Sequence, residues 1–206
     1  MAFLGTINVS RETNLWLGCY SDMLRKWSKS INLVSKRSLD DMWSRHFKDS
    51  AQLYNLVPHP VKIWADFGSG AGFPGLVVAI MAMEKGSPEN VMLMESDSRK
   101  CEFMRSVIRK TGAKAQIVND RVEHVMPLNA DVVSARALSE LQTLLKYASM
   151  HLKPSGVAIF PKGENWHEEV TRAKSVWHFR HQAVKSDISG GGVILKIKDI
   201  SIEQIF

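Results

Sequence analysis

Cysteine is scarce in this sequence, and several features that would indicate particular classes of protein are missing. Only Cys19 and Cys101 occur among 206 residues, far apart and in no metal-ligand spacing, so we expect reduced thiols and no bound metal. The longest apolar run, from Leu76 to Met83, is too short to cross a bilayer. The first residues combine no charged stretch with a long apolar one, which predicts no secretory signal. We therefore expect a soluble cytoplasmic protein with no membrane partner.

The composition that remains is that of a globular chain with a moderate basic excess. Apolar residues make up 45% and charged residues 23% of the sequence, and the formal net charge is +6. This provides enough apolar material for a core. There is no internal repeat and no low-complexity segment.

Residues 1–60 predict a helical extension. Apolar residues recur at spacings of three and four in a first stripe, which predicts an amphipathic helix: Leu15, Leu17, Tyr20, Met23, Leu24, Trp27 and Ile31. Ser38 is the predicted N-cap of a second helix that ends before Pro58. That helix is expected to direct five side chains inward: Leu39, Met42, Trp43, Phe47 and Ala51.

Residues 61–206 predict an α/β domain packed with the extension as one unit. Strands are expected at 61–67, 91–95, 115–119, 130–135 and 156–162, and helices at 75–83, 98–112 and 138–152. This alternation predicts a parallel sheet with helices on both faces. The end of the chain differs, because 179–187 and 193–200 flank the turn ISGGG and predict an antiparallel hairpin.

Four glycines and a proline separate two apolar runs in WADFGSGAGFPGLVVAI, residues 64–80. Glycine in ordered structure costs about 0.5–1 kcal/mol relative to alanine, so the cluster indicates a turn that a ligand approaches closely. From Gly70 to Gly75 the stretch fits G-x-G-x-x-G, the dinucleotide fingerprint. From Asp66 to Gly72 it fits D-x-G-x-G-x-G, the turn with which methyltransferases hold S-adenosylmethionine.

Other parts of the chain favour the second pattern. Both cofactors need an acidic residue at the end of the second strand to bind ribose hydroxyls, and Glu95 supplies it. An aspartate at position 66 suits a cofactor that carries an ammonium group. A terminal antiparallel hairpin is typical of the methyltransferase sheet and foreign to the all-parallel dinucleotide sheet. The structural alternative is a tight turn in which Asp66 only caps the following helix.

Five motifs in this order resemble the RsmG (GidB) family: KWSKSINLVS (26–35), RHFKDS (45–50), GSGAGFPGL (68–76), SARAL (134–138) and PKG (161–163). The resemblance implies an S-adenosylmethionine-dependent enzyme that methylates N7 of a guanosine in 16S ribosomal RNA. It also implies a Rossmann-like class I fold, with a seven-stranded, mostly parallel sheet whose last strand is antiparallel. The partner would be the RNA, the small ribosomal subunit or an assembly intermediate, and we expect a monomer.

Matched position by position, the resemblance implies cofactor contacts at Gly68 and Phe73, at Val122 and Glu123, and at Arg136. Three of these residues also have a structural interpretation. Phe73 is alternatively a core residue, and Glu123 a solvated surface carboxylate. Arg136 is alternatively half of an ion pair with an aspartate, either residue 66 or residue 131.

The RNA is expected to bind through basic residues. Seven of them lie between positions 25 and 48: Arg25, Lys26, Lys29, Lys36, Arg37, Arg45 and Lys48. Such side chains contact phosphates, although a solvated helix face is the commoner role of any single lysine. The predicted substrate contacts are Arg45 and His46 within a family motif, Arg136, and Lys162 at the end of the fifth strand. Guanine N7 carries no proton, so we expect no general base and no catalytic side chain.

Three other functions remain open from the sequence. A small-molecule methyltransferase would use the same cofactor turn, with the basic helices as a lid. A NAD-dependent oxidoreductase would use the dinucleotide pattern. A noncatalytic ribosomal RNA-binding assembly factor would keep the cofactor pocket only as structure.

Overall fold

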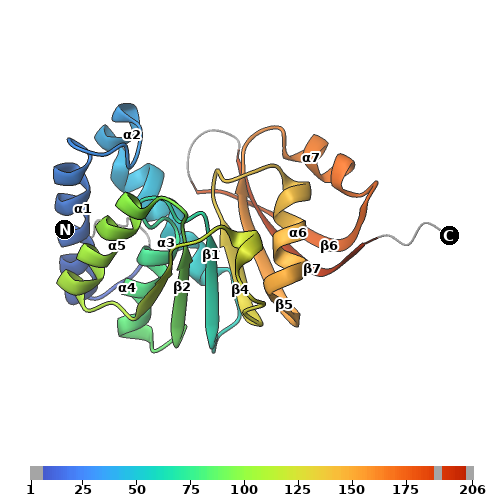
Figure 1. Cartoon of the computed structure of the whole chain (residues 1–206), viewed down its shortest axis with the longest axis horizontal. Coiled ribbons are helices and arrows are strands. Elements are labelled where there is room, and N and C mark those ends of the chain that lie inside the picture. Colours follow the sequence, from blue (N-terminus) through green and yellow to red (C-terminus); the bar gives the residue numbers. More distant parts are fainter. Residues whose placement is uncertain (1–6, 188–191, 203–206) are drawn as a thin grey trace.

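A computed structural model describes residues 7–187 and 192–202 of the chain (Figure 1). The first half contains α1 (Arg11–Trp27), α2 (Lys36–Asp40), the π-helix η1 (Trp43–Lys48), α3 (Asp49–Asn55), β1 (Ile63–Phe67), α4 (Gly75–Lys85), β2 (Asn90–Met94) and α5 (Ser98–Thr111). The second half contains β3 (Ala115–Val118), the 3-10 helix η2 (Val122–His124), β4 (Ala130–Ala135), α6 (Leu141–His151), β5 (Leu152–Lys162), α7 (Trp166–Ala173), β6 (Trp177–Lys185) and β7 (Val193–Ile202).

The strands form one seven-stranded sheet in the order β3-β2-β1-β4-β5-β7-β6. β1 to β5 pair in parallel, whereas β7 is antiparallel to both β5 and β6. This confirms the predicted methyltransferase sheet, with its antiparallel last strand. The strand order reverses between β1 and β4, and ligands of open α/β sheets bind beyond the carboxyl ends of the strands at such a point.

Helices cover both faces of the sheet (Figure 1). On one face, α1, α3, α4 and α5 share an apolar cluster with alternate strand residues, including Trp64 of β1. On the other, α6 and α7 pack on the intervening residues, including Phe67. The first cluster contains Tyr20 and Phe47 of the N-terminal helices as well as sheet residues. The proposed division at residue 60 stays a prediction.

The N-terminal helices differ in detail from the prediction. Ser38 is buried and is not the N-cap, because the Ser35 hydroxyl accepts from the Ser38 N–H one turn earlier. The predicted second helix is divided into α2, η1 and α3. Leu15 is 60% exposed and therefore lies outside the inward stripe. The helical region does end before Pro58, as predicted.

Three further predictions need correction or fall outside the description. The helix expected at 138–152 begins at Leu141, and α7 was missed. The segment from Lys153 to Gly156 belongs to β5. Residues 188–191 of the ISGGG turn lie outside the described residues, although β6 and β7 on either side form the predicted hairpin.

Among the residues described, no helix is long and apolar enough to span a bilayer.

Candidate functional site

A cavity of about 390 Å³ lies at the carboxyl ends of β1, β2 and β4. All six residues predicted to bind the cofactor line it: Gly68, Phe73, Glu95, Val122, Glu123 and Arg136. They come from the turn after β1, the end of β2, the loop with η2 and the loop after β4. Parallel strand order therefore brings together side chains that are up to 68 positions apart in the sequence.

The turn after β1 requires glycine at three alternate positions. Gly68, Gly70 and Gly72 have φ angles of 63°, 57° and 94°, in the region that favours glycine. A Cβ at Gly68 would lie 2.6 Å from Leu138 Cδ1, and one at Gly72 would lie 2.7 Å from the Tyr20 hydroxyl. The D-x-G-x-G-x-G pattern thus coincides with the positions at which the backbone turns left-handed.

Asp66 does not face this cavity, so its expected suitability for an ammonium group has no counterpart in the structure. It is fully buried, and its Oδ2 accepts from the Gly75 N–H at 3.1 Å. Its Oδ1 accepts from the Ser134 hydroxyl at 2.7 Å, which in turn accepts from the Trp64 indole N–H at 2.9 Å. Burial raises the pKa of Asp66 to about 6. Asp66 therefore binds the start of α4, as the structural alternative expected of this residue, whereas Gly68 and Gly70 of the turn line the cavity.

Glu95 closes β2 and lines the cavity while only 8% exposed. Its Oε2 accepts from the Gly70 N–H at 2.9 Å, and its Oε1 accepts from the Asp97 N–H at 2.8 Å. Each carboxylate oxygen has a second lone pair with which it can accept from another donor. The carboxylate thus ties the glycine turn to the end of β2 and retains capacity to bind hydroxyl groups.

The opposite wall of the cavity is formed by η2 and α6. Val122 is buried, and the ring of Tyr147 from α6 lines the same wall as Glu123. The side chain of Glu123 is 35% exposed, and a hydrogen bond from its own backbone N–H lowers the pKa of its carboxyl group. Glu123 therefore offers a charged acceptor at the edge of the cavity.

Aromatic rings connect the glycine turn to the N-terminal helices. The ring of Phe73 is nearly parallel to that of Tyr20, with centroids 5.2 Å apart, and to that of His46, with centroids 5.0 Å apart. The Tyr20 hydroxyl donates to the Ala71 carbonyl. Phe73 is 3% exposed, so it packs as a core residue and also lines the cavity. The turn is consequently supported by α1 and η1.

A second cavity, of about 760 Å³, adjoins the first. It is lined by all four residues predicted to bind the substrate: Arg45, His46, Arg136 and Lys162. Arg136 and Ala137 line both cavities. The loop after β4 therefore forms the boundary between the predicted cofactor site and the predicted substrate site.

His46 is uncharged at neutral pH in this arrangement. Neither ring nitrogen has a hydrogen-bond partner among the described residues. Burial, followed by the charges of Arg136 and Arg45, lowers the pKa of His46 to about 4. A neutral imidazole offers one donor and one acceptor, so His46 is suited to packing or polar contact and not to phosphate binding by charge.

Lys162 lies at the end of β5 as predicted, but its ammonium group is occupied. It donates to the Ser139 carbonyl at 3.0 Å and to Glu169 Oε2 at 2.7 Å, and its side chain is 8% exposed. Glu169 Oε2 also accepts from the Leu141 N–H at the start of α6. Lys162 thus stabilises the loop after β4, and its positive charge is neutralised by Glu169.

Arg136 forms an ion pair, although with neither aspartate considered from the sequence. Its Nη1 donates to the Arg45 carbonyl at 2.8 Å and to Asp49 Oδ2 at 3.2 Å. Its guanidinium carbon lies 5.2 Å from the centroid of the Phe73 ring. Asp49 follows His46 within RHFKDS, so that motif was the available signal that Asp49 belongs to the site.

Tyr20, which contacts the glycine turn, was identified from the sequence only as a residue of the apolar stripe. In the parts of the chain that are described, no cluster of metal-ligating side chains occurs.

Comparison with known proteins agrees with this geometry. The GidB family model, described as rRNA small subunit methyltransferase G, matches residues 14–193. A ribosomal RNA small subunit methyltransferase G from Ruegeria pomeroyi is 46% identical over 196 residues, which cover 95% of this chain and 96% of that protein. A protein of the same name from Rhodospirillum centenum is 46% identical over 199 residues, covering 97% and 90% of the two chains.

Solved methyltransferase structures share the fold at low sequence identity. A methyltransferase from Geobacter sulfurreducens has a TM-score of 0.61 at 14% identity, covering 94% of this chain and 91% of that one. TYW2 from M. jannaschii, in complex with AdoMet, has a TM-score of 0.57 at 14% identity, covering 86% and 80%. These likenesses show the fold alone.

Proposed function

This chain belongs to the GidB family of rRNA small subunit methyltransferases G, and we propose that it methylates N7 of a guanosine in 16S ribosomal RNA. The observation that carries the proposal is the junction of two cavities at Arg136 and Ala137. One cavity has the glycine turn and Glu95, and the other lies beside basic helices. A cofactor and a nucleotide bound in them would meet at the loop after β4.

The residues of the first cavity fit S-adenosylmethionine. A Cβ at Gly70 would meet nothing closer than the Gly68 carbonyl at 3.9 Å, so the turn presents bare backbone to open space. Glu95 supplies an acceptor for ribose hydroxyls, and Arg136 supplies a cation for a carboxylate. When bound, S-adenosylmethionine supplies an electrophilic methyl group on a sulfonium. Gly68, Phe73, Glu95, Val122, Glu123 and Arg136 would hold it.

The chain's own contribution to the reaction is positioning. Guanine N7 has an in-plane lone pair and no proton, so no side chain has to remove one. Phe73 and the loop after β4 border the cavities and restrict water, while His46 and Arg136 border the substrate side. Holding two reactants in line accounts for a large part of enzymatic acceleration. The mechanism therefore assigns no general base.

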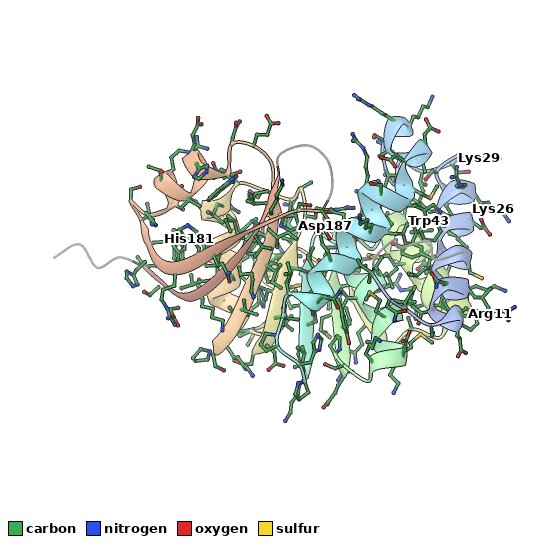
Figure 2. All side chains as sticks on the ribbon, turned by 180° about the vertical axis from the view of Figure 1, so that it is seen from behind. Arg11, Lys26, Lys29, Trp43, His181 and Asp187 are labelled. Carbon is green, nitrogen blue, oxygen red and sulfur yellow. The ribbon has the colours of Figure 1, made fainter. Side chains whose placement is uncertain are left out.

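Exposed basic residues of the N-terminal helices, one of which lines the second cavity, support an RNA substrate. Arg25, Lys26 and Lys29 are exposed at the end of α1 and just beyond it, where Figure 2 shows Lys26 and Lys29 at the outer edge of the molecule. Lys36, Arg37 and Arg45 are also exposed, and Arg45 lines the cavity itself. Such a surface binds phosphates and is weakened by salt. The RNA would act as substrate in the cytoplasm, alone or within the small subunit.

The proposal is tested by mass spectrometry of small-subunit RNA from a strain that lacks the gene. We expect one N7-methylguanosine to be absent from that RNA and to be restored by the purified protein with S-adenosylmethionine. Restoration of RNA assembly without methylation would instead identify a noncatalytic assembly factor. Unchanged RNA together with methylation of a metabolite would identify a small-molecule methyltransferase.

The N7 assignment makes a prediction about pH. The single-turnover rate on saturating RNA should stay level from about pH 6.5 to 9, because no cavity side chain needs to lose a proton. Burial lowers the pKa of His46 to about 4 and raises that of Cys101 to about 11, outside this range. A log-linear rise of unit slope across neutral pH would show that a base is required and that N7 is not the target.

A further inference from the structure

Arg136 is held from one end only. Both of its contacts, to the Arg45 carbonyl and to Asp49 Oδ2, use the same nitrogen, Nη1. None of the described residues accepts a hydrogen bond from its Nη2 or Nε. The side chains of Arg136 and Asp49 are 17% and 15% exposed, so the pair is largely shielded from water. The contacts thus fix the guanidinium while leaving donors available at the boundary of the two cavities.

Asp49 is itself held by a second set of contacts. Its Oδ1 accepts from the Gln52 side-chain amide at 2.9 Å. The same amide group donates to the Ser186 hydroxyl at 3.1 Å and accepts from the Asp187 N–H at 3.1 Å. Figure 2 shows Asp187 beside α3. A continuous line of hydrogen bonds therefore runs from the end of β6 through α3 to Arg136.

We propose that Asp49 is a positioning residue for methyl transfer, which orients Arg136 between the cofactor cavity and the substrate cavity. This inference rests on the proposed function of the site. Asp49 lines the substrate cavity beside Arg136, and its two carboxylate oxygens accept from Arg136 and Gln52. Its contribution to methyl transfer is therefore made through the orientation of Arg136. Because Asp49 begins α3 directly after η1, the same contact links these helices to the loop after β4.

The physical reason is the geometry of the guanidinium group. A planar group bound by two acceptors at one end is oriented, whereas a single carbonyl contact leaves it free to rotate. Without the carboxylate, Arg136 would keep only its bond to the Arg45 carbonyl. Its remaining donors would then be misplaced with respect to both cavities. Small misplacements of this kind reduce rates strongly, because in-line reactions depend on alignment.

The test compares Asp49→Asn with a matched control, Asp131→Asn. Asp131 is similarly enclosed, at 16% exposure of its side chain, and pairs with Lys153 while accepting from the Lys62 and Ile63 N–H groups. It lines neither cavity. We expect both variants to lower the Tm, but only Asp49→Asn to raise the Kd for S-adenosylmethionine, by about tenfold in calorimetry. Its kcat on ribosomal RNA should fall more than its KM rises.

A double variant separates positioning from general destabilisation. If Asp49 acts through Arg136, adding Asp49→Asn to Arg136→Gln should change neither the Kd nor kcat any further. Additive losses, or a wild-type Kd in folded Asp49→Asn, would overturn the inference. Failure of the proposed function would be seen in a different measurement. A wild-type protein that binds S-adenosylmethionine but does not methylate ribosomal RNA would contradict the proposed function, and the Kd values of the variants could still be compared.

Discussion

Replacing Gly68 with valine is expected to abolish binding of S-adenosylmethionine, with the Kd raised at least about a hundredfold. Two effects combine at this position. The φ angle of 63° is one that a β-branched residue adopts only under strain. In addition, a Cβ at Gly68 would lie 2.6 Å from Leu138 Cδ1, so the turn and the loop after β4 would be forced apart. Both segments line the proposed cofactor cavity.

The matched control for this variant is Gly112→Val. Gly112 ends α5 with a φ angle of 74°, and a Cβ there would meet nothing within 4 Å. Backbone strain should therefore destabilise Gly112→Val by about 1–2 kcal/mol, without an effect on the cofactor. Calorimetry and thermal unfolding of the two variants separate strain from loss of the site. Micromolar binding by folded Gly68→Val would contradict the assignment of the turn.

The fold class was predictable because its signals are local and repeat along the chain. Strands such as Ile63–Phe67 and Ala130–Ala135 are short apolar runs, and Gly112 ends its helix as predicted. The π-helix was not predictable, because Leu39, Trp43, Phe47 and Ala51 recur at a spacing of four, as in an ordinary helix. The missed α7 did carry a signal, since Trp166, Val170 and Ala173 recur at helical spacing.

The composition of the site was more predictable than its contacts. Chain order places the turn after β1, Glu95 and Arg136 at the same end of a parallel sheet, whatever their partners are. Which carboxylate pairs with Arg136 depends on how α3 packs against the loop after β4, and 21 acidic residues were candidates. The pairing of Lys162 with Glu169 likewise depends on the unpredicted α7. Interactions between helices and loops were thus beyond the reach of sequence patterns.

Glu95→Ala is expected to weaken S-adenosylmethionine binding by about 1.5–3 kcal/mol, the range for hydrogen bonds to a charged group. This corresponds to a Kd raised by roughly 10- to 150-fold. The loss has two sources, because the variant removes an acceptor for ribose hydroxyls and also leaves the Gly70 and Asp97 N–H groups without theirs. Calorimetry measures the sum of both effects.

Glu95→Gln distinguishes the two sources of that loss. The amide oxygen of glutamine can accept from either the Gly70 N–H or the Asp97 N–H, as one carboxylate oxygen does. Its NH₂ group would then face the other N–H, from which it cannot accept a hydrogen bond. If the Gly70 N–H contact dominates, Glu95→Gln should bind the cofactor nearly as well as the wild type, because its amide oxygen can still accept from that N–H. If the second carboxylate oxygen is needed for the ribose hydroxyls, Glu95→Gln should bind nearly as poorly as Glu95→Ala. Glu102→Ala serves as the control, because Glu102 is exposed on α5 and pairs only with Arg105 among the described ion pairs. A change in Kd below about twofold for Glu95→Ala would show that neither contact of Glu95 supports cofactor binding, and the ribose contact would then have to be sought elsewhere in the cavity, at Glu123.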